Sequence, residues 1–356
     1  MNGQRKIRVL IVDDSAIVRK ILTDALAAQP DIEVAGTAPD PYVARDKIVA
    51  LEPDVLTLDI EMPRMDGVTF LRKLMQHRPL PVIVISSLGR SSCEAAIAAL
   101  REGAVEVLAK PGGPYSVGDL VTGLAEKVRT AAGARVRRRS EAEPPAAPEA
   151  ESEPVRSAPP SPHGGRRLIA IGASTGGTEA IETVLNGIRP GGPGMVIVQH
   201  IPAGFSRAFA ERLDRVCPVR VKEAVDGDLV TPGAALVAPG SFHMTVQRAG
   251  DGFRVAVRDG PAVCYQRPSV DVLFASVAQA AGAHAVGVIL TGMGRDGAEG
   301  MLKMHRAGAY TIGQDEASSV VFGMPREAIR AGAVDRVAPL DRVAGEIQRA
   351  TAPAAR

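Results

Sequence analysis

Three residues in the second half of the chain have the types and positions that a hydrolytic triad needs. Ser174 follows the apolar run RLIAIGA, His200 follows GMVIVQ, and Asp296 lies in the glycine-rich segment after AVGVIL. Because the carboxyl ends of parallel strands meet at one edge of a sheet, we expect these side chains to converge. A serine hydroxyl becomes a nucleophile when a histidine accepts its proton, and that histidine needs an acid on its other nitrogen. We therefore predict Ser174 as the nucleophile, His200 as general base and then acid, and Asp296 as the residue that orients His200.

The segment IGASTGG around Ser174 also has simpler interpretations. A nucleoside-triphosphate loop needs GxxxxGK[ST], and no lysine follows Gly177. A dinucleotide-binding loop needs GxGxxG, a spacing that these glycines do not have. The segment alone also fits an inert turn between a strand and a helix. The letters GASTG match the GxSxG of α/β-hydrolases, but the chain order Ser, His, Asp differs from theirs. The match therefore concerns the turn alone.

Other residues compete for the roles of base and orienting acid. His243 is an alternative base, although its place in a predicted hairpin puts it off the main sheet. The remaining histidines fall in predicted helix ends, in the linker or on the surface, and we expect no chemistry from them: His77, His163, His284 and His305. The alternative orienting acids follow core strands less clearly than Asp296 does: Asp226, Asp259, Asp271 and Asp315. Backbone amides at 292–294 and after Ser174 are candidate donors to an oxyanion.

A second group of chemistry-bearing residues follows strands in the first half of the chain. Asp13 and Asp14 come after VLIV, and Asp59 comes after VLTL. Crowded carboxylates repel one another, and Mg²⁺ relieves this because it prefers hard oxygen ligands. Asp59 then has the chemistry of a carboxylate nucleophile that accepts a phosphoryl group. Lys110 and Ser86, each at the end of a further predicted strand, offer a charge and a hydroxyl to the new phosphoryl oxygens.

Five short β-branched runs alternate with amphipathic segments between residues 7 and about 130. The predicted strands are IRVLIV (7–12), IEVAGT (32–37), DVLTLDI (54–60), PVIVISS (81–87) and VEVLAK (105–110). The segments between them, such as SAIVRKILTDALAAQ, carry apolar residues at helical spacing. This alternation predicts an α/β domain at residues 1–130 with a doubly wound, parallel (βα)5 sheet.

Residues 131–166 differ from both flanks in composition. Pro, Glu, Ser and Ala dominate and no apolar period survives, which predicts a flexible linker. The alternation of strands and helices resumes over residues 167–356, with more glycine, and predicts a second parallel-sheet α/β domain that carries the hydrolytic residues. Within it, FHMTVQRAGDGFRVAVRDG predicts an antiparallel hairpin that turns at 250–252.

Composition excludes several classes of protein. The 42 basic and 40 acidic side chains give a net charge of +2, so the chain as a whole does not require nucleic acid or an anionic membrane as partner. Its three cysteines are widely spaced and form no CxxC, which argues against a disulfide framework or a zinc site. No apolar stretch approaches the roughly 20 residues of a membrane-spanning helix, and no signal peptide is recognisable. We expect a cytoplasmic protein.

The first half resembles the receiver domains of two-component systems over residues 7 to about 130. The motifs VLIVDDS, LTLDIEMPRMDG and LAKP carry the resemblance. It implies that Asp59 is phosphorylated, that Asp13, Asp14, Asp59 and the Glu61 carbonyl bind Mg²⁺, and that Ser86 and Lys110 sense the phosphoryl group. Receivers often have an aromatic residue three positions before the lysine, whereas this chain has Val107 there.

The second half resembles the catalytic domain of chemotaxis-type protein-glutamate methylesterases over about 167–340. The resemblance rests on IGASTGG, VQHIPAGFSRAFAERL, RPSVDVLF, LTGMGRDGAEGM and DEASSVVFGMPREA. It implies hydrolysis of γ-glutamyl methyl esters on chemoreceptors, deamidation of receptor glutamines, and no cofactor for the ester chemistry. It also implies a triad of Ser174, His200 and Asp296, a pocket lined by Thr175 and Met293, and a chemotaxis histidine kinase as phosphodonor.

Two other classes of function are open to a chain with a receiver domain. One is a response regulator whose second half binds a partner without catalysis. The other is a DNA-binding regulator, which the absence of a basic recognition helix disfavours. The sequence does not identify the receptor, the kinase, the balance of the two activities, the oligomeric state or how the switch works with Val107.

Overall fold

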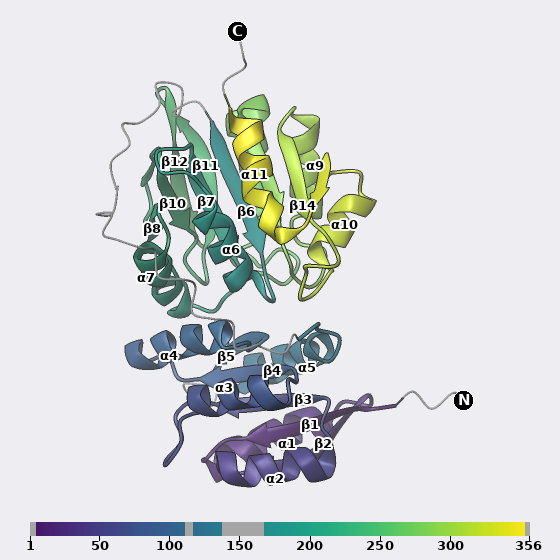
Figure 1. The fold of residues 1–356 in the computed structure, drawn as a ribbon. Coiled ribbons are helices and arrows are strands. Elements are labelled where there is room, and N and C mark those ends of the chain that lie inside the picture. The colour runs from purple at the N-terminus through teal and green to yellow at the C-terminus, as the bar shows by residue number, and fades with distance from the viewer. Residues whose placement is uncertain (1–4, 111–116, 137–166, 353–356) are drawn as a thin grey trace. The chain divides into compact units, whose positions relative to one another are not determined.

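The computed structural model describes residues 5–110, 117–136 and 167–352 (Figure 1). The chain divides into two compact units, Met1–Glu149 and Ala150–Arg356, and each has its own parallel sheet. The predicted linker at 131–166 lies mostly outside the described residues, although helix α5 continues to Ala132.

The first unit is built on a five-stranded parallel sheet in the order β2-β1-β3-β4-β5. Its strands are β1 (Ile7–Val12), β2 (Ile32–Ala38), β3 (Val55–Asp59), β4 (Val82–Ser86) and β5 (Glu106–Ala109). Its helices are α1 (Ala16–Ala27), α2 (Pro41–Leu51), α3 (Gly67–His77), α4 (Arg90–Arg101) and α5 (Val117–Ala132). Side chains of Ser15, Asp40 and Asp66 accept first-turn amides of α1, α2 and α3, which explains where these helices begin.

The second unit contains a seven-stranded parallel sheet in the order β15-β14-β13-β6-β7-β10-β8. Its strands are β6 (Leu168–Ala173), β7 (Gly194–Gln199), β8 (Arg220–Glu223), β10 (Ala234–Val237), β13 (Ala285–Ile289), β14 (Tyr310–Gln314) and β15 (Arg336–Ala338). Its helices are α6 (Gly177–Asn186), α7 (Phe205–Val216), α8 (Val270–Ala281), the short η3 (Gly282–His284), α9 (Ala298–Arg306), α10 (Met324–Arg330) and α11 (Leu340–Thr351). Strand β6 lies at the centre of this sheet between β13 and β7, and all of its residues are buried.

A small antiparallel sheet completes the second unit. The predicted hairpin is formed by β11 (His243–Ala249) and β12 (Gly252–Arg258), and β9 (Leu229–Val230) pairs with β12. Helix α8 packs against β11 and α9, and its apolar face contributes Phe274 to the core. The predicted α/β class and the hairpin are confirmed, whereas the short strands β9 and β15 and the helices α10 and α11 were not predicted.

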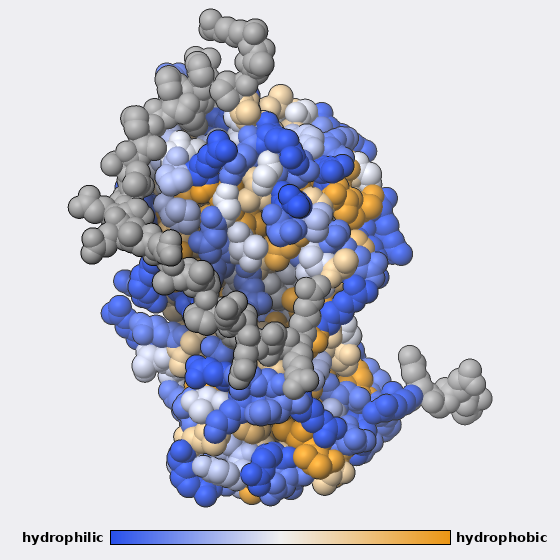
Figure 2. Space-filling model, in the orientation of Figure 1, coloured by the Kyte–Doolittle hydropathy of each residue, from blue (hydrophilic) through white to orange (hydrophobic). Residues whose placement is uncertain are grey.

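The surface of this protein is mainly hydrophilic on the face shown in Figure 2, with scattered hydrophobic areas. The exposed large apolar side chains include Ile17 and Val49 in the first unit and Val225 and Leu229 in the second. Among the described residues, no helix combines the length and apolar character that crossing a membrane requires.

Candidate active site and phospho-acceptor site

Two of the predicted triad residues directly follow neighbouring strands at the centre of the second sheet, and the third lies in the loop after the next strand. Ala173 of β6 and Gln199 of β7 are the last paired residues of their ladder, so Ser174 and His200 come next on adjacent strands. The His200 amide donates to the Ala173 carbonyl at 3.0 Å, which continues the ladder to this position. Asp296 lies in the loop between β13 and α9, and β13 pairs with β6 on its other side.

A tight turn holds Ser174 between β6 and α6. Its amide donates to the Thr291 carbonyl at 3.0 Å, and its carbonyl accepts the Gly177 amide at 2.7 Å. Gly176 has φ +75°, and a Cβ at this position would lie 2.6 Å from the Val320 side chain. Only glycine allows the chain to turn here and begin α6 three residues after the serine. The Gly177 amide, the first of α6, is thus engaged with the Ser174 carbonyl, which removes it from the candidate oxyanion donors.

His200 and Asp296 form a buried pair. Nε2 of His200 lies 2.8 Å from Oδ2 of Asp296, and the two side chains are 4% and 3% exposed. Nδ1 of the same ring is buried and has no hydrogen-bond partner among the described residues. A proton on Nε2 is required for the bond to the carboxylate, which leaves the lone pair on Nδ1. The ring thus carries an unprotonated nitrogen next to the strand that bears Ser174.

The amino-terminal end of α8 holds the Asp296 carboxylate. Oδ2 accepts the Val270 amide at 2.8 Å, while Oδ1 accepts the Asp271 amide at 3.0 Å and the Ser269 hydroxyl at 2.8 Å. Burial acts to raise the pKa of Asp296, but the hydrogen bonds from His200 and from these amides outweigh it, so the pKa is lowered. The carboxylate is therefore ionised and fixed in position at neutral pH.

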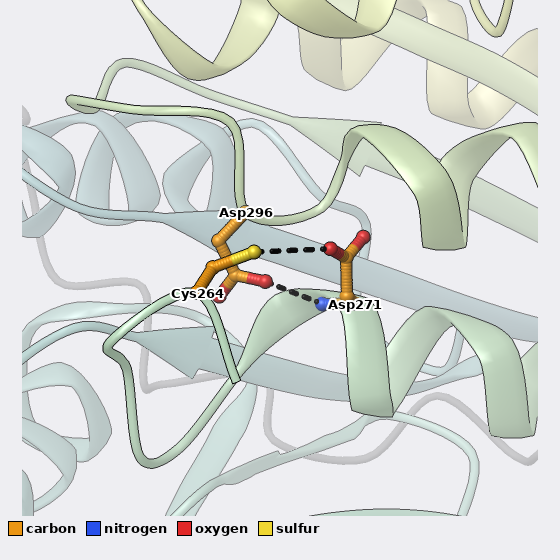
Figure 3. A group of neighbouring side chains, drawn as sticks. All are labelled: Cys264, Asp271 and Asp296. Carbon is orange, nitrogen blue, oxygen red and sulfur yellow. Dashed lines mark hydrogen bonds between the residues drawn. The ribbon is translucent and has the colours of Figure 1, made fainter. Parts of the chain in front are cut away.

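Cys264 and Asp271 lie beside Asp296, as Figure 3 shows. The Cys264 thiol donates to Oδ2 of Asp271 at 3.8 Å, and Oδ1 of Asp271 accepts the Gly300 amide at 2.7 Å. Burial raises the pKa of Asp271, and the negative charge of Asp296 adds to this effect. Asp271 thus contributes its amide to Asp296, while the two carboxyl groups repel each other.

The loop after β13 closes the site on the other side of Ser174. A Cβ on Gly292 would lie 2.7 Å from Cβ of Ser174 and 2.3 Å from Sδ of Met324. The Gly292 amide donates to the Val321 carbonyl, which removes it from the candidate oxyanion donors. Met293 follows in the same loop and is half-buried. Thr175, the other predicted pocket residue, is buried, and its carbonyl accepts the Thr291 hydroxyl at 2.9 Å.

The alternative base and acids take other places. Nδ1 of His243 accepts the Ser269 amide at 3.3 Å and Nε2 donates to the Pro261 carbonyl at 2.9 Å, so both ring nitrogens are engaged. Asp226 and Asp259 pair with arginines 258 and 267, and Asp315 accepts the amide and hydroxyl of Ser318. Sequence reasoning missed Ser269, although a serine directly before the apolar run VDVLF is typical of a helix start.

The first unit brings together the residues predicted to accept a phosphoryl group. Carboxylate oxygens of Asp13, Asp14 and Asp59 lie within 4.8 Å of one another. Nζ of Lys110 lies 2.6 Å from Oδ2 of Asp59 and 3.2 Å from Oδ2 of Asp13. Burial raises the pKa of Asp13 and that of Asp59, against the opposing effect of Lys110. Three carboxyl groups thus face one lysine, and such a set of hard oxygen donors fits Mg²⁺.

Ser86, the other residue predicted to sense the phosphoryl group, is the last residue of β4. The Ser86 hydroxyl is buried and donates to the Ser92 carbonyl at 3.2 Å. The Glu61 side chain accepts hydrogen bonds from Ser92 and from Ser87, at 3.0 Å for the latter, and these bonds lower its pKa. Val107, at the position where receivers often have an aromatic residue, is fully buried in β5.

Comparisons with known proteins agree with both halves of the chain. The family described as CheB methylesterase matches residues 169–347, and the response regulator receiver domain matches residues 9–121. A protein-glutamate methylesterase/protein-glutamine glutaminase of Syntrophus aciditrophicus is 56% identical over 344 residues, which cover 97% of this chain and 99% of that protein. One from Anaeromyxobacter dehalogenans is 54% identical over 347 residues, or 97% of this chain and 95% of that protein.

A solved structure supports the fold of the second unit. The crystal structure of the Thermotoga maritima CheB methylesterase catalytic domain is 33% identical to this chain, with a TM-score of 0.50. It covers 51% of this chain, and the match spans 97% of that structure. The chain therefore belongs to the CheB methylesterase family and carries a response regulator receiver domain ahead of its methylesterase domain.

Proposed function

We propose that this chain hydrolyses γ-glutamyl methyl esters on chemoreceptors, releases methanol, and also deamidates receptor glutamines. The main support is the arrangement of Ser174 and His200 on adjacent strands, with His200 bound to the buried Asp296 at 2.8 Å. The close relatives that span nearly the whole chain carry these two activities in their names. Thr175, which follows Ser174, and Met293, which follows Gly292 in the loop packed against Ser174, are the proposed pocket residues.

The geometry suits a serine-hydrolase reaction. Oγ of Ser174 attacks the ester carbon and its proton passes to Nδ1 of His200, which has no hydrogen-bond partner in the described part of the chain. The imidazolium is stabilised through Nε2 by Asp296 and then gives its proton to the leaving methoxide, which departs as methanol. Water attacks the acyl-enzyme by the same route, restoring Ser174 and yielding the glutamate carboxylate. With a glutamine substrate the leaving group is ammonia, and the tetrahedral oxyanion is similar.

The receiver domain supplies the proposed control. Asp59 accepts a phosphoryl group from a chemotaxis histidine kinase, and Ser86 and Lys110 contact the product. Asp13, Asp14, Asp59 and the Glu61 carbonyl are the residues that would hold Mg²⁺, whose charge, when it is bound, offsets that of the carboxylates and of the phosphoryl oxygens. We place the receiver at residues 1–130, the linker at 131–166 and the catalytic domain at 167–356, and we place the enzyme in the cytoplasm, where such kinases act.

Methanol release from methylated receptor membranes tests this proposal. Wild type should release methanol faster after treatment with acetyl phosphate, and Ser174→Ala should release none in either condition. Ser276→Ala is a matched control, because Ser276 lies on α8 and its hydroxyl bonds the Val246 amide and the Leu273 carbonyl rather than Asp296. A Ser174→Ala protein that keeps its activity would rule out the serine mechanism. A wild-type protein that binds receptor without releasing methanol would instead indicate the binding-module alternative.

A further inference from the structure

Asp296 has a separate set of partners for each carboxylate oxygen. Oδ2 bonds His200 Nε2 and the Val270 amide, both at 2.8 Å, and so carries the link to the triad. Oδ1 bonds the Asp271 amide at 3.0 Å and the Ser269 hydroxyl at 2.8 Å. The Ser269 hydroxyl is thus the only side-chain group, among the described residues, that holds the oxygen facing away from His200.

Ser269 is itself held on every side. It is fully buried, and its amide donates to Nδ1 of His243 at 3.3 Å. The His243 ring is fixed in turn by its Nε2 bond to the Pro261 carbonyl. The hydroxyl oxygen also accepts the Val272 amide at 3.4 Å and so caps α8. Because the hydroxyl has one proton, and Asp296 accepts it, the direction of this bond is set.

The carboxylate needs restraint at both oxygens because its terminal torsion is soft. Rotation about the Cβ–Cγ bond of an aspartate meets a broad, two-fold energy profile. Without the Ser269 hydroxyl, Oδ1 keeps only the longer bond from the Asp271 amide, at 3.0 Å, among the described residues. A second carboxyl group, that of Asp271, has an oxygen within 4.8 Å of one of Asp296, and repulsion between the two groups opposes the position of Asp296. A hydroxyl on Oδ1 counteracts both effects and keeps Oδ2 directed at the histidine.

We propose that Ser269 is a positioning residue of the hydrolytic reaction: its hydroxyl orients Asp296, which orients His200. This role rests on the proposed serine-hydrolase function and deepens it. His243 accepts the Ser269 amide and so helps to fix the residue that holds Asp296. The Ser269 hydroxyl bonds Asp296 and caps α8, and its effect on the reaction passes through Asp296.

Ser269→Gly separates this role from helix capping. Glycine is tolerated at a helix N-cap nearly as well as serine, so the fold should persist while the hydroxyl is lost. We expect kcat for methanol release to fall about 10-fold, the effect of about 1.4 kcal/mol on the barrier, with KM within about twofold of wild type. Ser269→Thr retains the hydroxyl and should keep kcat within about threefold of wild type. Ser276→Ala, on the same helix but away from Asp296, should match wild type.

A second readout needs no receptor. A fluorophosphonate probe forms a bond from its phosphorus to Oγ of Ser174, fluoride leaves, and the serine proton passes to His200. Its rate of labelling should fall in Ser269→Gly by a factor similar to that in kcat. If wild type reacts with the probe but releases no methanol, the proposed substrate is wrong while the role of Ser269 is still measured.

The proposal is overturned by a folded Ser269→Gly protein with wild-type kcat and labelling rate. It is also overturned if only KM changes, or if a folded Ser269→Thr protein is as slow as the glycine variant. Melting curves identify which variants are folded. If the added methyl group of threonine unfolds the domain, the Ser269→Gly protein by itself tests the proposal.

Discussion

His200 presents its two ring nitrogens to different surroundings: Nε2 lies 2.8 Å from Oδ2 of Asp296, and Nδ1 is buried without a hydrogen-bond partner among the described residues. The bond to Asp296 selects the tautomer in which Nδ1 is free to accept a proton. Asp296 therefore determines whether His200 can act as a base at all, and its replacement has a large expected effect.

Asp296→Asn should lower kcat by about 10³–10⁴-fold with little change in the fold, the size of loss expected when the histidine is left in the wrong tautomer. Two amides and the Ser269 hydroxyl donate to Asp296, so an asparagine amide group cannot satisfy all of its neighbours. Steady-state methanol release measures the effect. Asp315→Asn, which alters a turn at Ser318, is the control, and an Asp296→Asn enzyme within tenfold of wild type would speak against the assignment.

Asp271→Asn should stabilise the catalytic unit at neutral pH. The pKa of Asp271 is raised in the folded state, mainly by burial. Ionised Asp271 therefore lowers the free energy of unfolding above that pKa, and this loss disappears as the pH falls through it. Asparagine keeps an oxygen for the Gly300 amide and removes the charge next to Asp296. We expect the melting temperature at pH 7 to rise by about 2–4 °C, as about 1 kcal/mol produces in a domain of this size. The gain should shrink as the pH is lowered towards 4; a gain that does not depend on pH would exclude this electrostatic cause.

Gly292→Ala should impair both catalysis and stability. Its Cβ would lie 2.3 Å from Sδ of Met324 and 2.7 Å from Cβ of Ser174, so the nucleophile or the loop must move. Overpacking of this kind costs about 1–3 kcal/mol, measurable by urea unfolding, and misplacement of Ser174 should lower kcat. A Cβ on Gly345 would lie within 4 Å of no described atom beyond its own stretch of α11, so Gly345→Ala should be neutral or stabilising. Equal effects of the two changes would refute the steric argument.

Lys110→Ala should destabilise the receiver in metal-free buffer. Nζ of Lys110 lies 2.6 Å from Asp59 and 3.2 Å from Asp13, and both carboxyl groups are buried. Removing one partner of a buried charge cluster costs about 3–5 kcal/mol, and adding Asp59→Asn should recover part of it because one of the repelling charges is gone. Thermal unfolding of the three proteins measures this. Lys20→Ala, which breaks an exposed pair with Asp24, should have little effect. A double variant less stable than Lys110→Ala would contradict the charge argument.

Removal of residues 1–130 should raise the basal rate of ester hydrolysis if the unphosphorylated receiver inhibits the enzyme. Allosteric coupling of ordinary size corresponds to an increase of about 5-fold or more. Full-length Asp59→Asn keeps the receiver and should stay at the low basal rate with or without acetyl phosphate. An unchanged or lower rate in the truncated protein would exclude inhibition by the receiver.

The alternation of strands and helices was sufficient to predict both parallel sheets and the edge at which Ser174, His200 and Asp296 appear. That prediction worked because a polar residue directly after a buried parallel strand must lie at the carboxyl edge of the sheet. The short strands β9 and β15 carry two and three residues, too few for a period to be recognised.

The support of Asp296 by α8 was not predictable in the same way. Ser269 and Asp271 are distant from Asp296 in sequence and meet it only because α8 packs beside β13 and β6. Likewise, His243 has the chemistry of a base, and only its two hydrogen bonds show that both of its nitrogens are occupied. Tertiary contacts, rather than residue type, separate these roles.

Ser174 and His200 directly follow the terminal pair of the β6–β7 ladder, Ala173 and Gln199. A slip of that ladder by two residues would keep every side chain on its proper face, yet would displace the nucleophile from its base by roughly 7 Å. Molecules with the misaligned ladder would therefore be inactive even when their circular dichroism spectra match that of the native protein. The fraction of a refolded sample that reacts with an active-site titrant counts the chains in which these two strands are correctly aligned.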